Sequence, residues 1–241
     1  MLLLQEQVII NTPQISIPGN NLRLQHDGIL VGGVDEAGRG SIIGPLVVAG
    51  ISIRESKIAQ LREMGVKDSK MLTPKARARL FGEIIQGADS VCIRKINPAE
   101  VDGSVFQKGL NRLEAKVMAN IINNIGAEEV YVDCCDINPE RYKGYLESHL
   151  MCTPKLHSMH HADSINVVVS AASIVAKITR DHEIQEIRKK YRNIGSGYPS
   201  DDKTIKFIKS WIEKNGCAPE FARKSWKPVR LMLDQLAQCK L

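Results

Sequence analysis

Two adjacent carboxylates interrupt an otherwise apolar region in the segment Gly33-Val34-Asp35-Glu36-Ala37-Gly38-Arg39-Gly40. The apolar run Ile29-Leu30-Val31 precedes the segment, and a second apolar run, Pro45-Leu46-Val47-Val48-Ala49, follows it. The carboxylates therefore stand at the end of a predicted buried strand, where a charge is costly unless a cation or another partner compensates it. Next comes Gly38-Arg39-Gly40, called the glycine turn below, whose backbone amides can approach a ligand closely while the guanidinium offers an anion a planar fork. The segment predicts metal-dependent phosphate chemistry.

Acids recur at the ends or edges of other predicted strands. Asp133 ends the apolar stretch Val130-Tyr131-Val132, and Asp163 follows a further strand near residues 156–161. Ligand sites in open α/β sheets lie at strand ends, so these acids and the Asp35-Glu36 pair are expected to converge. Hard oxygen ligands without an accompanying set of histidines favour Mg²⁺ or Mn²⁺ over zinc. Two such ions would activate a water and stabilise the leaving oxygen of an in-line phosphoryl displacement.

Each of these acids also has an ordinary structural interpretation. Asp163 starts a predicted helix, so it is equally explained as a helix cap. Asp136 competes with Asp133, but the following Ile137-Asn138-Pro139 favours a turn or capping role for it.

The alternation of apolar runs with helical periodicity predicts an α/β fold with a mixed sheet flanked by helices. We expect strands at residues 30–35, 46–53, 90–96, 130–133 and 156–161. We expect helices at residues 56–64, 74–87, 105–125, 139–150, 164–191, 201–214 and 227–239. Thr73-Pro74 is a good helix start, because Thr caps and Pro suits the first turn. Residues 8–10 and 14–17 are expected to form a short hairpin.

This pattern predicts three parts of the chain. Residues 1–28 form an N-terminal extension without an assigned role, residues 29–192 a catalytic domain, and residues 193–241 a helical C-terminal lobe. From Glu186 to Arg230 there are twelve Lys and Arg against five Asp and Glu, although the whole chain carries a net charge of only +6. A basic lobe on a nearly neutral body favours a polyanionic partner such as nucleic acid, but a solvated lysine-rich surface gives the same count.

Composition and the chain start predict a cytoplasmic protein. The 241 residues are 43% hydrophobic, without an apolar run of the roughly 18 residues that spans a bilayer. Met1-Leu2-Leu3-Leu4 lacks a basic leader and a cleavage site, so no secretory signal is expected. The six cysteines show no CxxC pairing and are expected to be reduced. Cys152, His157, His160 and His161 lack zinc-finger spacing, which favours ordinary strand and loop roles over a zinc site.

Taken together, these motifs resemble ribonuclease HII, a type-2 ribonuclease H, of the archaeal kind. The resemblance spans residues 30–230 in the order of the family. The matching motifs are Asp35-Glu36-Ala37-Gly38-Arg39-Gly40 with Gly44-Pro45, Lys67-Asp68-Ser69-Lys70-x-Leu72-Thr73, Tyr131-x-Asp133, Ala162-Asp163, Val168-x-Ser170-Ala171-Ala172-Ser173-Ile174-x-Ala176-Lys177, Arg180-Asp181 and Gly195-Ser196-Gly197-Tyr198-Pro199-Ser200-Asp201.

The resemblance implies a ribonuclease-H-like fold and a set of site residues. Four metal-binding catalytic carboxylates are implied, namely Asp35, Glu36, Asp133 and Asp163. The glycine turn, Gly38, Arg39 and Gly40, is implied to recognise the 2′-hydroxyl of a ribonucleotide, the group that distinguishes RNA from DNA. Tyr198 is implied to stack on the next sugar and so to sense the RNA–DNA junction. Residues expected near the phosphates are Lys70, Ser170, Ser173 and Lys177.

The function so implied is that of an Mg²⁺- or Mn²⁺-dependent endoribonuclease. It would hydrolyse RNA in RNA–DNA hybrids and cut on the 5′ side of ribonucleotides embedded in duplex DNA, leaving 3′-hydroxyl and 5′-phosphate ends. The expected partners are these duplexes, with no membrane, and the enzyme is expected to be a monomer. A sliding clamp is not supported, because residues 235–241 lack an aromatic clamp-binding tail.

Two rival functions remain open from the sequence. A nucleic-acid-binding module without activity would not need four acids at strand ends. A DNA nuclease of the same fold, such as a junction resolvase or an exonuclease, needs neither the glycine turn nor Tyr198.

The chain departs from the family pattern in three places. Ser41-Ile42-Ile43 stands where Pro and a hydrophobic pair are usual, and Met71 replaces a frequent Lys. Residues 1–28 are longer than the usual start but too short for the extra N-terminal domain of ribonuclease HIII. Arg39 in the glycine turn also favours ribonuclease HII over that relative.

Overall fold

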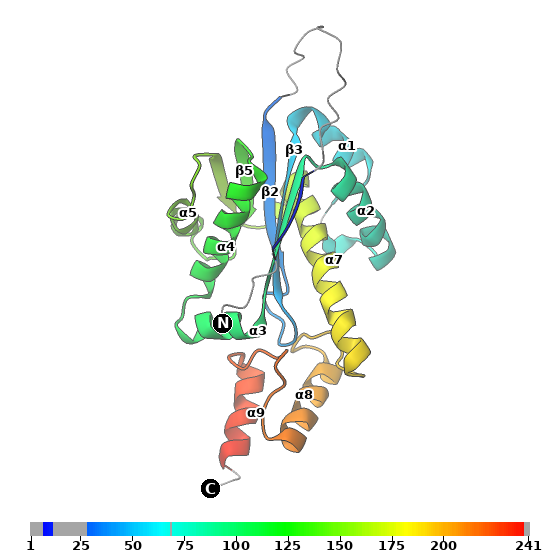
Figure 1. Cartoon of the computed structure of the whole chain (residues 1–241), viewed down its shortest axis with the longest axis vertical. Coiled ribbons are helices and arrows are strands. Elements are labelled where there is room, and N and C mark those ends of the chain that lie inside the picture. Colours follow the sequence, from blue (N-terminus) through cyan, green and yellow to red (C-terminus); the bar gives the residue numbers. More distant parts are fainter. Residues whose placement is uncertain (1–6, 12–27, 68, 239–241) are drawn as a thin grey trace.

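A mixed sheet with helices on both faces forms the body of the computed structural model, which describes residues 7–11, 28–67 and 69–238 (Figure 1). The strands are β1 (Gln7–Asn11), β2 (Leu30–Ala37), β3 (Leu46–Arg54), β4 (Ser90–Ile96), β5 (Glu129–Asp133) and β6 (Lys155–Met159). The helices are α1 (Ile58–Glu63), α2 (Pro74–Gly87), α3 (Pro98–Phe106), α4 (Leu110–Ile125), α5 (Pro139–Glu147), α6 (Ala162–Ile165), α7 (Val167–Lys190), α8 (Asp202–Asn215) and α9 (Lys227–Gln238), with 3₁₀ turns η1 (Glu55–Lys57) and η2 (Ser69–Met71).

The sheet has the strand order β1-β4-β3-β2-β5-β6. β2 runs antiparallel to β3 and parallel to β5, and β5 runs parallel to β6. In the β2–β5 pair, Val34 lies opposite Val132. Because the two strands are parallel, the acids that follow these residues come to the same edge of the sheet.

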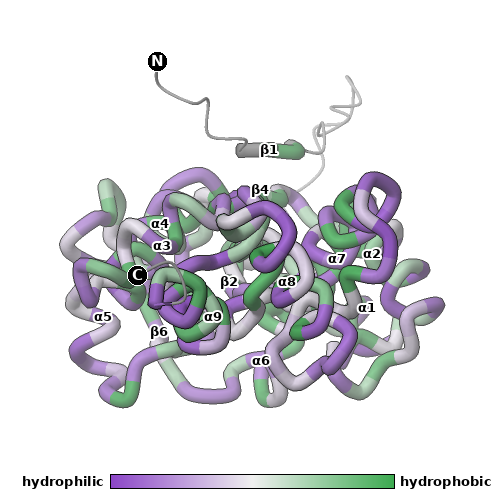
Figure 2. Tube along the Cα trace, turned by 90° about the horizontal axis from the view of Figure 1, so that it is seen from below, coloured by the Kyte–Doolittle hydropathy of each residue, from purple (hydrophilic) through white to green (hydrophobic). Residues whose placement is uncertain are grey.

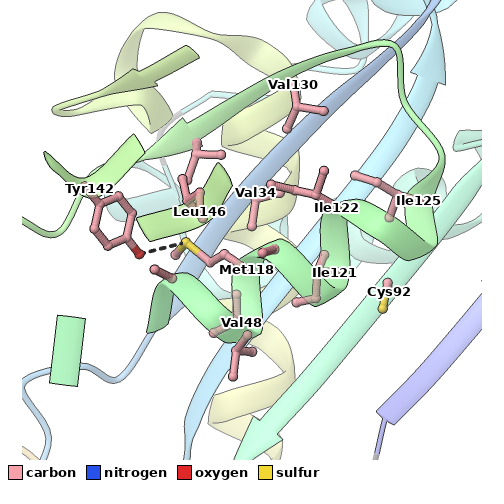
Figure 3. Close-up of a cluster of buried hydrophobic side chains, with 14 of the residues drawn as sticks. Val34, Val48, Cys92, Met118, Ile121, Ile122, Ile125, Val130, Tyr142 and Leu146 are labelled. Atoms are coloured by element: carbon pink, nitrogen blue, oxygen red, sulfur yellow. Dashed lines mark hydrogen bonds between the residues drawn. The ribbon is translucent and has the colours of Figure 1, made fainter. Parts of the chain in front are cut away.

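Two apolar layers hold helices to the two faces of the sheet. On one face, α4 covers β2, β3 and β4, and α5 packs beside it against α4 and β6, with Val34, Ile121 and Val130 fully buried (Figure 3). There the Tyr142 hydroxyl donates to Met118 Sδ at 3.2 Å. On the other face lie α1, α2 and α7, and their buried side chains form a second cluster with the sheet (Figure 1).

Helix α7 lies unusually close to β2. A Cβ atom on Gly33 would collide with the backbone of Val168, so only glycine fits at this point of β2. Ala171 and Ala172, one turn further along α7, are fully buried. The small residues noted in this part of the sequence therefore allow the helix to pack tightly against the strand that carries Asp35 and Glu36.

Two of the expected helices are divided in the structure. The helix expected at 105–125 is α3 followed by α4, separated at Lys108, whose φ of +54° is left-handed. The start of α3 was missed, although Asn97 caps it by accepting from the Glu100 amide at 2.9 Å. The helix expected at 164–191 is α6 followed by α7, and Asn166 caps α7 by accepting from the Val168 amide at 2.8 Å.

Other expected elements agree with the structure within a few residues. Thr73 caps α2, its hydroxyl accepting from the Ala76 amide at 3.2 Å. Residues 8–10 lie in β1, which pairs with β4 at the outer edge of the sheet (Figure 2). The expected hairpin partner, residues 14–17, lies outside the described residues.

Helices α8 and α9, which belong to the proposed C-terminal lobe, lie at one end of the sheet (Figure 1). They pack around an apolar cluster of their own, which includes Ile208, Ile212 and Val229. Ile42 and Ile43 of the body join this cluster, and Ile43 forms a β-bridge with Ala222. The lobe is thus anchored on Ile42 and Ile43, which follow the glycine turn after Ser41. Over the part of the chain that the structure describes, no helix has the length and apolar character needed to cross a membrane.

Candidate active site

Three of the four predicted metal ligands meet at the edge of the sheet. Asp35 and Glu36 come from the end of β2, and Asp133 comes from the end of β5. One carboxylate oxygen from each of the three lies within 4.8 Å of the others. These residues, called the acid cluster below, offer the closely spaced hard oxygen ligands that Mg²⁺ and Mn²⁺ prefer.

The acid cluster lacks the positive charge that its carboxylates need. Burial and the neighbouring charge of Asp133 raise the pKa of Asp35 to about 8. Burial, with the charge of Asp35 next, raises the pKa of Glu36 well above its usual value, and burial likewise raises the pKa of Asp133. Glu36 Oε2 is buried and has no hydrogen-bond partner among the described residues. A divalent cation would satisfy this oxygen and supply the missing charge, so the cluster fits a metal site.

Asp163, the fourth predicted ligand, lies beside the acid cluster. It is 2% exposed, and its charge helps to raise the pKa values of Asp35 and Asp133, after the contribution of burial. Its Oδ2 accepts from Lys70 Nζ at 2.9 Å. The segment is held in place because the Ala162 amide donates to Asp133 Oδ1 at 2.7 Å. The structure therefore brings three predicted ligands together and places the fourth next to them in an ion pair.

The side chain of Arg39 points toward α4, where it fastens the glycine turn. Arg39 Nε donates to both carboxylate oxygens of Glu114 at 3.0 Å, and Nη2 donates to Asn111 Oδ1 at 2.8 Å. Glu114 is fully buried. The guanidinium, considered in the sequence as a fork for an anion, already has a carboxylate partner, which leaves the backbone of the turn as its ligand-facing part.

Carbonyl groups of the glycine turn are also fixed. Gly38 O accepts from the Ser41 hydroxyl at 2.8 Å, and Arg39 O accepts from Arg223 Nη1 at 2.8 Å. A Cβ atom on Gly40 would meet no atom within 4 Å, so the turn faces open space there. Within the described part of the chain, the amides of Arg39 and Gly40 donate to no protein acceptor.

The two serines expected near the phosphates hydrogen-bond to Asp163 and Asp35 instead. The Ser170 hydroxyl donates to Asp163 O at 2.5 Å, and Ser173 hydrogen-bonds to Asp35 and lies 2.9 Å from the Ser69 hydroxyl. Both serines are buried, so in this structure they stabilise the positions of the acids. The two lysines are more open: the side chain of Lys70 is 73% exposed. Lys177 Nζ is 2.6 Å from Asp181 Oδ1.

Tyr198, the predicted junction sensor, lies in the loop of residues 195–200 that precedes α8, called the Tyr198 loop below. The Arg180 guanidinium carbon lies 4.4 Å from the centroid of its ring. The structure thus places the tyrosine against a buried arginine of α7.

Asp136, the rival of Asp133, has the turn role that the sequence favours. Its Oδ1 accepts from the Asn138 amide at 2.9 Å and from Arg141, and its Oδ2 accepts from Asn111 at 2.8 Å. Hydrogen bonding by Arg141 and by the Asn138 amide lowers the pKa of Asp136 to about 2. The side chains of the rejected zinc group make ordinary contacts, such as the 2.8 Å pair of His157 and Glu129.

The sequence did not predict the polar residues that hold the glycine turn and the Tyr198 loop in place. Glu114, Asn111 and Arg223 are far from the glycine turn in sequence and contact it only in the fold. Arg180 stands in a motif of the resemblance, but its contact with the Tyr198 loop was not predicted. One signal was present: Glu114 follows Leu113 within the apolar periodicity of a predicted helix, where a buried acid needs a partner.

Comparison with known proteins assigns the family. Residues 32–229 match the family model described as Ribonuclease HII. The chain belongs to the ribonuclease HII family. Ribonuclease HII of Cenarchaeum symbiosum is 48% identical over 204 residues, 85% of this chain and 98% of the relative. That of Methanoregula boonei is 43% identical and covers 88% and 98% of the two chains.

Solved structures of ribonuclease HII agree with this assignment. Ribonuclease H2 from Pyrococcus horikoshii has a TM-score of 0.82 and 38% identity, covering 87% of this chain and all of that one. The ribonuclease HII in a complex with PCNA from Archaeoglobus fulgidus has a TM-score of 0.76 and 38% identity, with coverage of 83% and 96%. The expected ribonuclease-H-like fold is confirmed.

The family establishes the activity in outline. This ribonuclease HII is a ribonuclease H, an endoribonuclease that removes RNA from RNA–DNA hybrids. The family requires a divalent metal ion, which the acid cluster fits. The non-catalytic binding module and the DNA nuclease are accordingly not favoured.

Proposed function

We propose that the acid cluster and Asp163 form the metal-binding catalytic centre of this ribonuclease HII, and that the enzyme cuts 5′ of ribonucleotides embedded in duplex DNA. The observation that carries the proposal is the group of three carboxylates within 4.8 Å, with one buried Glu36 oxygen left without a partner. The products would carry 3′-hydroxyl and 5′-phosphate ends.

The acids and Lys70 have different electrostatic roles in the proposed centre. When bound, one or two Mg²⁺ or Mn²⁺ ions would lower the pKa of an attacking water and offset the charge that develops on the phosphate. Asp35, Glu36 and Asp133 would hold the metal from the ends of two rigid parallel strands. Asp163 lies beside them, where the Lys70 ammonium supplies the positive charge that a buried carboxylate needs. The exposed stem of Lys70 also leaves its ammonium within reach of a phosphate.

The glycine turn is proposed to select the ribose. Its amides at Arg39 and Gly40 are available donors, and the side of Gly40 is open. A 2′-hydroxyl can accept from such amides, and a deoxyribose lacks this group. Glu114 and Arg223 hold the turn rigidly through Arg39, so the amides are positioned before the substrate binds.

The duplex is proposed to extend over the C-terminal lobe. A groove of about 670 Å³ in this lobe is lined by Arg192, Lys203, Lys206 and Lys214, next to Trp211. Among the described residues, none of these four cations forms an ion pair. Unpaired cations that line a groove suit the phosphates of a nucleic acid.

A sliding clamp becomes a candidate partner through the comparison. The relative from A. fulgidus is seen in a complex with PCNA. Co-elution of the two proteins in size-exclusion chromatography, with this chain alone as reference, decides whether it binds a clamp and whether it is a monomer.

One assay tests the proposed cleavage. A labelled DNA duplex with a single ribonucleotide and its all-DNA twin are incubated with Mg²⁺, with Mn²⁺ or with EDTA. We expect cleavage of the first duplex alone, 5′ of the ribonucleotide, with either metal and none with EDTA. Equal cleavage of the all-DNA twin would contradict ribose selection, and cleavage in EDTA would contradict the metal centre.

A further inference from the structure

Arg180 of α7 lies between the glycine turn and the Tyr198 loop. It is 1% exposed. Its guanidinium carbon lies 4.4 Å from the centroid of the Tyr198 ring, and its Nη2 donates to Ser196 O at 3.1 Å. A weaker contact of 3.4 Å joins Nη1 to Asp181 Oδ1. One face of the arginine therefore fixes the tyrosine ring while its edge holds the loop that carries this ring.

Two glycines close on the same guanidinium. Gly38, with a φ of +85°, would place a Cβ atom 3.0 Å from Arg180 Nε. Gly197, with a φ of +86°, would place one 3.0 Å from Arg180 Nη2. The turn proposed to recognise the ribose and the loop proposed to sense the next sugar thus share one rigid neighbour.

A second buried arginine, Arg223, connects the C-terminal lobe to the glycine turn. Arg223 extends from the C-terminal lobe to the carbonyls of Arg39 and Gly44, at 2.8 Å and 3.2 Å. Burial, with the nearby charge of Arg180 next, lowers the pKa of Arg223 to about 10. Two buried like charges cost stability, so this pair is better explained by the geometry it imposes than by a gain in folding free energy.

We propose that Arg180 is a positioning residue that sets the Tyr198 ring relative to Gly38–Gly40 and thereby sets the preference of the enzyme for a single embedded ribonucleotide over continuous RNA. The proposal rests on the function proposed above. A planar guanidinium stacks on a ring and donates from its edge at the same time, whereas the ammonium of lysine cannot do both. In this scheme Arg180 does not touch the reacting phosphate, because its side chain is buried between Gly38 and Gly197.

The first test compares Arg180→Lys with the matched control Arg188→Lys. Arg188 belongs to the same helix and also holds the Tyr198 loop, by donating to Gly195 O at 2.5 Å, but it has no contact with the tyrosine ring. We measure kcat/KM on a DNA duplex with one ribonucleotide and on a continuous RNA–DNA hybrid. Arg180→Lys is expected to lose roughly tenfold on the first substrate and less than about twofold on the second, in line with the worth of a buried cation–π contact. Arg188→Lys is expected to keep the wild-type ratio.

A double-substitution cycle separates positioning from general stability. If Arg180 acts through the ring, Arg180→Lys in a Tyr198→Leu background adds no further loss on the single-ribonucleotide duplex. Losses that multiply would contradict the proposal. Tyr198→Phe, which keeps the ring, is expected to remain sensitive to Arg180→Lys.

A second variant covers the case in which Arg180→Lys folds poorly. Gly197→Ala keeps the Arg180 side chain but places a methyl group 3.0 Å from its Nη2, in a left-handed backbone conformation that alanine strains. Both effects separate the Tyr198 loop from the guanidinium, so the same shift in substrate ratio is expected. Melting curves define which variants are folded at the assay temperature.

The two proposals fail in different ways. A wild-type enzyme that leaves the single-ribonucleotide duplex intact overturns the proposed function. A wild-type enzyme that cuts it, with folded Arg180→Lys or Gly197→Ala variants that keep the wild-type ratio or lose equally on both substrates, overturns only the role of Arg180.

Discussion

At the scale of single residues, Asp35 illustrates what burial does to a carboxylate beside other acids. The same side chain is stable as a neutral acid without a cation, because burial and Asp133 raise its pKa to about 8. It is a good metal ligand when a cation is present. The ionised form of Asp35 therefore needs a nearby positive charge.

The variant Asp35→Asn tests whether the Asp35 carboxylate is needed for cleavage. An amide keeps the shape but donates hydrogen bonds and carries no charge, so we expect loss of cleavage by at least about a thousandfold, with binding to the single-ribonucleotide duplex retained. Single-turnover cleavage and a binding titration measure the two effects. Asp102→Asn is the control: Asp102 is buried but accepts from Ser225 and Lys224, so this variant should lose stability and keep activity within a few-fold. An Asp35→Asn enzyme that cuts at the wild-type rate contradicts the assignment.

The acids could be predicted from sequence, and their supports could not. Asp35, Glu36 and Asp133 stand at the ends of apolar strands, a local pattern that places them at one sheet edge once the strands pair. The pairing of Arg39 with Glu114 depends on how α4 crosses the sheet, which no local spacing contains. The orientation of the Arg39 guanidinium was therefore decided only by the fold.

Asp136 provides a prediction about pH. Its pKa is lowered to about 2 in the folded protein, against roughly 3.9 in an unfolded chain, so it stabilises the fold above about pH 4 and loses this effect as the pH falls toward 2. The contribution at neutral pH is roughly 1–2 kcal/mol, since Arg141 is half exposed. Urea unfolding of wild type and Asp136→Asn should show a difference at pH 6 that shrinks by pH 3. A difference that stays constant with pH would sink this assignment.

At the scale of elements, the crossing of α7 over β2 determines where the acid cluster lies. Gly33→Ala would push the helix away from the strand and lower the free energy of unfolding by at least about 2 kcal/mol. Gly82→Ala, in the interior of α2 with open space around it, is the control and should be neutral or stabilising by about 0.5–1 kcal/mol. Chemical denaturation of both variants measures the difference. A Gly33→Ala protein as stable as wild type would show that the helix can shift freely.

Element types were easier to predict than element boundaries. The predicted strand boundaries agree with the structure within a few residues, because short apolar runs bounded by polar turns indicate buried strands in an α/β chain. The division of the expected helix at 105–125 was missed because Lys108 adopts a left-handed conformation, which lysine does not favour. The division at Asn166 matters more, since it places Asp163 in α6 beside the acid cluster.

At the scale of the whole molecule, the charge of the C-terminal lobe predicts a salt dependence. Lys206→Ala removes one proposed phosphate contact from the groove, so the slope of log K against log salt should become less steep by about 0.9. Lys116→Ala, on the exposed side of α4, should leave the slope unchanged. Binding titrations over a series of salt concentrations measure both. Equal slopes for the two variants would place the duplex elsewhere.

The position of β1 has a consequence for solubility. β1 pairs with residues 90–94 of β4 and so occupies most of the outer hydrogen-bonding edge of the sheet (Figure 2). A chain shortened to residues 29–241 would leave that edge with unsatisfied amides and carbonyls, which invites β4 of a second molecule to pair with it. We expect concentration-dependent self-association of the shortened protein in light scattering, with cleavage unaffected at low concentration. The N-terminal strand would then serve as a guard against aggregation, independently of catalysis.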